Sequence, residues 1–156
     1  MKALTIWQPW ATLIAFDAKP YEFRGWKAPK SLIGQRIAIH AGARPVKHKE
    51  VASILEALEE SGDMNPGMIK EHAKVLLQSV LEGKYHLPHS CIVCTAVLGE
   101  PVSARNLVEN SSPVSNDSDR EEHFNFAWPL TDIQPIIPPT PARGKQGFWN
   151  TNLEAA

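Results

Sequence analysis

The sequence lacks the features that mark several large classes of protein. No apolar run approaches the length of a membrane-spanning helix. The opening run, residues 1–6, is too short and too soon interrupted by polar residues to be a signal peptide. The formal net charge of −1 gives no global basic field of the kind that holds long duplexes. We therefore expect a cytoplasmic protein with no membrane partner, in which any basic site is small.

Cysteine is also scarce, since the chain has only Cys91 and Cys94, in one β-branched apolar run. Such a run is typical of a buried strand, where a spacing of three sends the two thiols to opposite faces. That geometry opposes both a disulfide and shared ligation of one metal. His86 and His89 lie just upstream, but a zinc site would need a second ligand pair at a suitable distance. We expect buried thiols, no metal and no other cofactor.

The bulk composition is that of one ordinary globular domain. The chain has 156 residues, of which 43% are hydrophobic and 21% charged, so it can bury a core without disulfide support. It shows no internal repeat and no obvious linker. Residues 110–122 are rich in Ser, Asn, Asp and Glu, which predicts a flexible surface loop. We expect a single domain over residues 1–156.

Local patterns predict both strands and helices. Alternating or β-branched apolar runs predict strands at 2–7, 21–26, 36–40, 90–98, 123–130 and 133–137. Proline at a helix start and apolar residues at helical spacing predict helices at 9–16, 46–60 and 68–82, with a single helical turn within 101–107. The expected fold is α+β: a small β-barrel of about five to six strands, with peripheral helices and a helical pair inserted at 46–83.

The most informative cluster lies at residues 17–24, Asp-Ala-Lys-Pro-Tyr-Glu-Phe-Arg. If the chain is extended from residue 20, Glu22 and Arg24 point to the same face, and a turn can bring Lys19 toward them. A carboxylate between two cations, close to tryptophans, is a plausible site for a nucleobase or nucleotide. The alternative interpretation is a salt-bridged surface strand.

Trp7 and Gln8 come at the end of the first predicted strand, which favours contact with a ligand. An indole face can stack on a base, and an amide offers a donor and an acceptor to a base edge. Trp10 follows the apolar spacing of the predicted helix, so we assign it mostly to the core. We also expect Trp128 and Trp149 in the core.

Several motifs, taken together, point to one known family. A strand leads into Trp7-Gln8-Pro9-Trp10, Lys-x-x-Glu-x-Arg follows at 19–24, a later strand ends in His40-Ala41-Gly42, and Gly-x-x-Gly-Phe-Trp occupies 144–149. These motifs resemble the ASCH domain family, within the PUA-like superfamily of pseudo-barrel RNA-binding modules. The resemblance covers most of the chain and leaves 46–83 and 110–122 as inserts. The family motif is Gly-x-Lys-x-x-Glu-x-Arg, and Asp17 stands here in place of its glycine.

The resemblance implies a PUA-like β-barrel whose cleft is lined by the motif, and a role tied to RNA or modified nucleosides. Distant relatives are amidohydrolases that deacetylate N4-acetylcytidine, with threonine in the place of Glu22. Ribonuclease activity has also been ascribed to members. Two hypotheses follow: a module that binds RNA or a modified nucleotide, or a hydrolase acting on a nucleoside or RNA. A protein-interaction domain that uses the helical insert is a third.

Under the hydrolase hypothesis Lys19, Glu22 and Arg24 form the catalytic set: Lys19 stabilises an oxyanion, Glu22 activates water and Arg24 orients Glu22. Under the binding hypothesis Lys19 and Arg24 contact the ligand. Further candidate binding residues are the histidine at a strand end and the polar residues near the two glycine-containing segments: His40, Arg44, Lys145 and Gln146. A structural role is the alternative interpretation for each of them.

Overall fold

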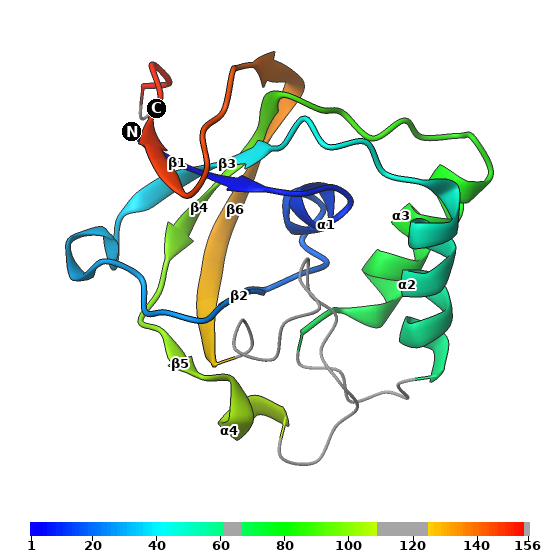
Figure 1. Cartoon of the computed structure of the whole chain (residues 1–156), viewed down its shortest axis with the longest axis horizontal. Helices are drawn as coiled ribbons and strands as arrows, with labels where there is room; N and C mark the ends of the chain where they lie inside the picture. Colours follow the sequence, from blue (N-terminus) through cyan, green and yellow to red (C-terminus); the bar gives the residue numbers. More distant parts are fainter. Residues whose placement is uncertain (61–66, 109–124, 155–156) are drawn as a thin grey trace.

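The computed structural model describes residues 1–60, 67–108 and 125–154. It is an α+β fold in which a mixed sheet curls into a half-barrel around α1, with α2 and α3 to one side (Figure 1). The elements follow the chain in this order: β1 Lys2–Ile6, α1 Trp10–Ala15, β2 Tyr21–Arg24, a 3₁₀ turn Lys30–Leu32, β3 Arg36–Ala41, α2 His48–Glu60, α3 Lys70–Leu81, β4 Cys91–Leu98, β5 Val102–Ser103, α4 Ala104–Val108, β6 Phe126–Pro141 and β7 Phe148–Asn150. The order of strands in the sheet is β2-β6-β4-β3-β1-β7, and β5 pairs with β6.

The curl of the sheet brings the two ends of this strand order close together. Trp26, just after β2, contacts Phe148 of β7 with ring centroids 6.4 Å apart. Trp128 of β6 lies between them, stacked on Phe148 at 5.8 Å and edge-on to Trp26 at 4.8 Å. The Trp128 indole N–H donates to the Trp26 carbonyl. This aromatic contact joins β2 to β7 although no backbone pairing between them is present in the described residues.

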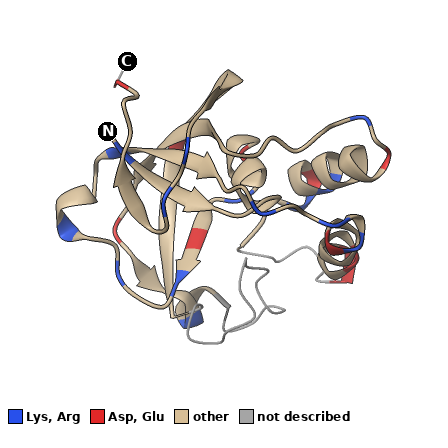
Figure 2. Cartoon of the chain, turned by 45° about the horizontal axis from the view of Figure 1, so that its top comes forward, with Lys and Arg blue, Asp and Glu red and all other residues tan. Residues whose placement is uncertain are grey.

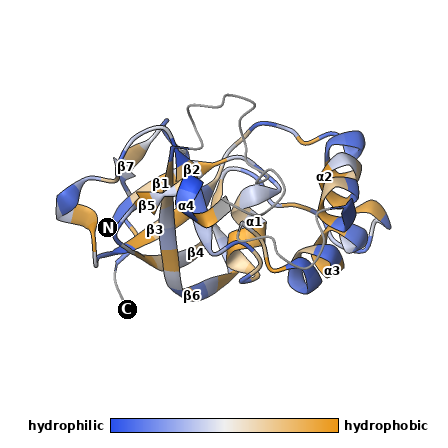
Figure 3. Cartoon of the chain, turned by 90° about the horizontal axis from the view of Figure 1, so that it is seen from below, coloured by the Kyte–Doolittle hydropathy of each residue, from blue (hydrophilic) through white to orange (hydrophobic). Residues whose placement is uncertain are grey.

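The main core lies inside the curl, where α1 packs against the sheet. All six residues of α1 are buried. Every residue of β4 but one is also buried, as expected for a strand covered on both faces. Figure 3 shows the hydrophobic stretches of α1 and the strands gathered in this region. Trp10, Trp128 and Trp149 are buried, which confirms their assignment to the core.

The helical pair α2 and α3 lies beside α1 on the side away from the sheet (Figure 1). Apolar residues on the inner faces are buried, among them Val51, Leu58, Leu76 and Leu77. Both helices were predicted by their apolar spacing, with bounds that differ by two residues at most. Gly83 follows the end of α3 in the left-handed conformation, at φ 72°.

Strand β6 differs from the sequence prediction, and the short strands β5 and β7 were not predicted as strands. Residues 123–130 and 133–137 were predicted as two strands, but β6 runs unbroken through Asp132 to Pro141. Both halves pair with β4, and the register shifts between Thr95 and Val97 absorb the irregularity at Asp132, where φ is 47°. Thr131-Asp132 is therefore a bulge within a ladder and not a turn between strands. The single helical turn expected within 101–107 corresponds to the short β5 and α4.

The remaining predictions on organisation concern the thiols, the acidic loop and membrane-spanning segments. Cys91 and Cys94 are free and buried on β4, as predicted. Burial raises the pKa of Cys94 to about 12. The predicted loop at 110–122 lies outside the described residues. Among the helices that the structure describes, none is long and apolar enough to cross a bilayer.

Candidate functional site

Lys19, Glu22 and Arg24 form one ion cluster, as the sequence predicted. Lys19 Nζ lies 2.8 Å from Glu22 Oε2, and Arg24 Nη2 lies 3.0 Å from Glu22 Oε1. Lys19 Nζ also donates to the Tyr21 carbonyl at 2.7 Å. Glu22 and Arg24 share a face because they alternate with Phe23 along β2. We call these three residues the ionic cluster.

Burial makes the ionic cluster different from a surface salt bridge. The side chains of Lys19 and Glu22 are 0% exposed, and that of Arg24 is 21% exposed. The ammonium lies 5.6 Å from the ring centroid of Phe23 and 6.0 Å from that of Trp10, so aromatic rings replace part of its water. Two cations and one carboxylate leave a net formal charge of +1 in a mostly desolvated place. The surface-strand interpretation is therefore wrong for Lys19 and Glu22.

Two polar atoms of the ionic cluster have no hydrogen-bond partner among the described residues. They are Glu22 Oε1 and Arg24 Nε, and both are buried. Glu22 Oε1 is close to Arg24 Nη2, but the geometry of that contact is an ion pair without a directed hydrogen bond. A buried polar atom without a partner is unfavourable by about 1–3 kcal/mol. Such atoms are few in native proteins, and each calls for an explanation such as a functional role or a bound water or ion.

The turn before β2 sets the position of Lys19. The N–H groups of Asp17 and Ala18 donate to carbonyls of α1, at Ile14 and Leu13 respectively. Asp17 adopts the left-handed conformation at φ 55°, which glycine and asparagine or aspartate adopt more readily than other residues. The chain then enters β2, where Glu22 pairs with Trp128 and Arg24 with Phe126 of β6.

Thr5 of β1 joins the ionic cluster to other predicted site residues, and the sequence analysis missed it. Its carbonyl accepts from Arg24 Nη2 at 3.5 Å, and its hydroxyl donates to the Lys145 carbonyl at 2.6 Å. The same hydroxyl lies 3.2 Å from His40 Nδ1 and accepts from the Trp149 indole at 3.0 Å. The only sequence signal was a threonine flanked by the buried Leu4 and Ile6 on an apolar strand.

His40 is held by a second set of contacts at the end of β3. Its Nε2 lies 2.9 Å from the Ala142 carbonyl, and its ring is edge-on to Trp149 at 5.3 Å. Gly144 packs so closely on this ring that an added Cβ would lie 2.2 Å from it. Burial lowers the pKa of His40, against the raising effect of the hydrogen bond to Ala142. The buried His40 side chain therefore holds the 142–147 turn in place through its contacts with Ala142 and Gly144.

Trp7, which follows the last residue of β1, forms an exposed pair with Arg44. The Arg44 guanidinium lies 4.6 Å from the Trp7 ring centroid, and Trp7 is 45% exposed. Nη1 and Nη2 of Arg44 also donate to Glu50 of α2, which orients the guanidinium over the indole. Trp7 packs against Gly42 as well, where a Cβ on residue 42 would lie 3.4 Å from the indole. The pair offers an aromatic surface with a cation beside it.

Gln8 is placed differently from the ligand role that the sequence suggested. It is buried, and its amide nitrogen donates to Thr12 Oγ1 and to the Pro88 carbonyl, both at 2.7 Å. Its amide oxygen accepts from the Thr12 backbone N–H at 3.0 Å. Both amide hydrogens and the oxygen are thus used within the protein. Lys145 and Gln146, by contrast, are exposed on the turn that follows His40's contacts.

No family model matches this sequence, and no curated protein matches it significantly. Among the described residues, no group of three or more His, Cys, Asp and Glu side chains is placed to hold a metal ion. The charges elsewhere are mixed: Figure 2 shows Lys and Arg beside Asp and Glu on α2 and α3, while most of the sheet carries neither. The ionic cluster, joined to Lys145 through Thr5, is the strongest candidate site on these observations.

Proposed function

We propose that this protein is an RNA- or modified-nucleotide-binding domain of the ASCH type, with a PUA-like fold. The observation that carries the proposal is the buried ionic cluster with its net positive charge and its two unpartnered polar atoms, Glu22 Oε1 and Arg24 Nε. The Arg24 side chain is 21% exposed, so its guanidinium can meet a phosphate or a base acceptor, while the buried Glu22 holds that guanidinium in place. A guanidinium oriented in this way is a natural contact for one nucleotide.

Three further features support this function. The half-barrel is compatible with a PUA-like architecture. Asp17 has a left-handed backbone at the position where the family motif carries glycine, the residue best suited to that conformation. The exposed Lys145 is joined to the ionic cluster through Thr5, and Trp7 with Arg44 supplies a stacking face and a cation just after β1. A net charge of −1 suits a ligand of one or a few nucleotides better than a long duplex.

The hydrolase alternative uses the same residues, with Glu22 as the base. It requires water to reach a carboxylate that is 0% exposed and has a cation close to each oxygen. Enclosure of this kind favours a recognition role over a base that activates water. We therefore place binding first and treat turnover as an outcome of the test.

The test combines binding and turnover on the same preparations. Fluorescence anisotropy follows a labelled eight-nucleotide single-stranded RNA between 50 and 300 mM NaCl, with wild type, Arg24→Gln and Lys145→Gln. We expect weaker binding by both variants and a salt slope reduced by about 0.7 for each phosphate that the variant no longer neutralises. Lys84→Gln is the matched control, because Lys84 is an exposed cation whose ion pair is with Glu82 and not with the ionic cluster.

The same proteins, with Lys19→Ala, are incubated with N4-acetylcytidine, and products are followed by chromatography. Turnover by wild type that Lys19→Ala abolishes would establish the hydrolase instead. RNA binding that is the same in wild type, Arg24→Gln and Lys145→Gln would contradict the proposed site. Absence of both binding and turnover would contradict the proposed function as a whole.

A further inference from the structure

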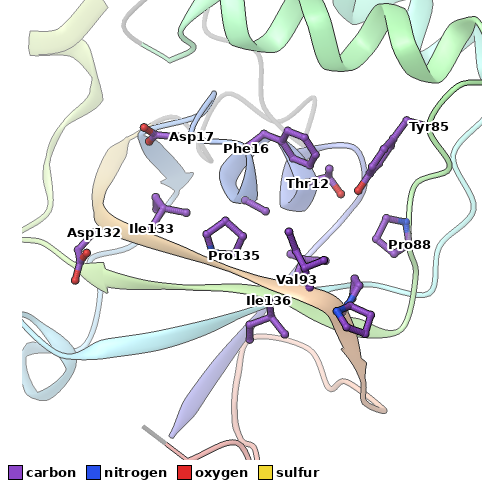
Figure 4. Close-up of a pocket in the computed structure, with 14 residues that line it drawn as sticks. Thr12, Phe16, Asp17, Tyr85, Pro88, Val93, Asp132, Ile133, Pro135 and Ile136 are labelled. Carbon is purple, nitrogen blue, oxygen red and sulfur yellow. The ribbon is translucent and has the colours of Figure 1, made fainter. Parts of the chain in front are cut away.

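A second candidate site lies against the opposite face of α1 from the ionic cluster. At 100° per residue, Thr12 and Ala15 lie on the far side of this helix from Trp10, which approaches Lys19. Thr12, Ala15 and Phe16 line a pocket of about 800 Å³ that β6 closes on its other side (Figure 4). The volume falls within the range of about 300–1,000 Å³ usual for small-molecule sites.

The walls of this pocket are mostly aromatic and aliphatic. Phe16 and Tyr85 meet edge to face, with ring centroids 5.5 Å apart. Opposite them, Ile133 and Pro135 come from β6, whereas Ile136 points to the other side of the strand, toward Ala3 and Trp149 (Figure 4). Phe16 is 50% exposed, and Ile137 on the β6 wall of the pocket is 88% exposed. Such exposure of large apolar side chains around one hollow is typical of a binding surface.

The strand that forms the floor is unsuited to pairing with a strand from another protein. Beyond Leu130, one edge of β6 pairs with β4, and no strand of the described residues pairs with the other edge. Prolines at positions 135, 138 and 139 remove three backbone donors from this part of β6, and Pro protects open edges against added strands. The pocket therefore favours an occupant held by side-chain contacts over an extended peptide.

The charged residues that line the pocket are both carboxylates, which favours a ligand of positive charge. Asp17 and Asp132 lie toward one end, with Tyr85 and Pro88 toward the other (Figure 4). Asp132 is already paired with Arg36. The exposed Asp17 carboxylate has no ion pair or hydrogen bond with any described residue, and no Lys, Arg or His belongs to the described lining of the pocket. An unneutralised carboxylate at the rim of an apolar hollow complements a cation.

We propose that this pocket binds a small amphipathic organic cation, an aromatic or alicyclic ring that carries a protonated amine. The ring lies between the Phe16–Tyr85 pair and β6, and the ammonium reaches Asp17. An aromatic pair at the entrance also favours a cation over an anion, because the ring faces carry negative charge. The inference does not rest on the proposed nucleotide site, which has charge of the opposite sign.

The experiment uses three probes of the same shape that differ only in charge: 1-naphthylmethylamine, 1-naphthalenemethanol and 1-naphthoic acid. Titration of the full chain is followed by methyl NMR shifts at Ile133 and Val93, and by calorimetry. We expect the amine to bind most tightly and the acid most weakly. Asp17→Asn should weaken the amine by about three- to fivefold, the size of one exposed ion pair, and leave the alcohol unchanged.

Asn is the matched substitution at position 17, because it keeps the shape and tolerates the left-handed backbone. Ile137→Ser should weaken all three probes, since it removes an apolar wall without disturbing the core. Val102→Ser, at an exposed apolar residue outside the pocket, is the control and should leave all three affinities unchanged. Equal affinity for the three probes, an amine affinity unaffected by Asp17→Asn, or no shift at the pocket methyls at millimolar probe would overturn the proposal.

Discussion

The ionic cluster and the apolar pocket lie against opposite faces of the same short helix, and they are built in opposite ways. The cluster encloses Lys19 and Glu22 completely, so each charge depends on the other for compensation. The pocket leaves Asp17 at its rim in contact with solvent, where water already compensates the charge. The difference teaches that a charged residue matters to stability in proportion to its desolvation. A carboxylate can therefore hold other side chains in place on one side of a helix, as Glu22 does, and be free for a ligand on the other side, as Asp17 is.

The largest expected effect that separates the two regions comes from removing one carboxylate in each. Glu22→Ala leaves the buried Lys19 ammonium without its counter-ion, and loss of one partner of a buried pair destabilises by about 3–5 kcal/mol. Asp17→Asn should change the free energy of unfolding by less than about 0.5 kcal/mol. Urea unfolding followed by circular dichroism measures both. Similar changes in the free energy of unfolding for the two variants would contradict the contrast between a desolvated and a solvated carboxylate.

A smaller effect separates the aromatic residues of the two regions. Phe23 is fully buried on β2 beside Lys19, whereas Phe16 is half exposed at the pocket. Phe23→Leu should destabilise the protein by roughly 1–2 kcal/mol, because it leaves unfilled volume in a packed core. Phe16→Leu should have an effect of about 0.5 kcal/mol or less on stability. Thermal melts of the two matched variants test this, and an equal loss of melting temperature would contradict it.

The smallest expected effect is a pH dependence of the free energy of unfolding, which comes from His40, a residue linked to the ionic cluster through Thr5. Burial lowers the pKa of His40 below its ordinary value of 6.5, so the unfolded chain binds this proton more readily than the folded protein. The stability from neutral His40 is fully present above pH 6.5 and declines as the pH falls below it, with a slope of at most about 1.4 kcal/mol per pH unit.

Urea midpoints of wild type and His40→Gln between pH 5 and 8 measure this contribution. The difference in stability between the two proteins should narrow below pH 6.5. Asp17→Asn provides the control from the pocket side, and its curve should follow that of wild type over pH 5.5–8. Parallel plots of stability against pH for wild type and His40→Gln would contradict the lowered pKa of His40.

Much of the fold and the ionic cluster could be predicted from the sequence. Alternation along 21–24 places Glu22 and Arg24 on one face whatever the rest of the chain does, because it follows from the geometry of an extended backbone. The apolar spacing of 46–60 and 68–82 similarly predicted α2 and α3. Residue type and local spacing were sufficient in these places.

Other parts of the site depended on segments far apart in the chain. Gln8 has the chemistry of a ligand contact, but the carbonyl of Pro88, 80 residues away, turns its amide inward. Thr5 has no distinctive sequence pattern, yet it contacts Arg24, His40 and Lys145 because β1 lies between β3 and β7. β6 was divided in two by turn-forming residues, whereas its pairing with β4 keeps it continuous.

The sequence by itself determined the helices and most of the strands, the buried thiols and the pairing of Lys19, Glu22 and Arg24, because each depends on residues within a few positions of one another. Only the tertiary structure decided how deeply the ionic cluster is desolvated and where the apolar pocket lies. Burial depends on what packs over a side chain, and the pocket is assembled from α1, the segment before β4 and the far half of β6. Those segments meet through long-range packing, which local periodicity does not encode.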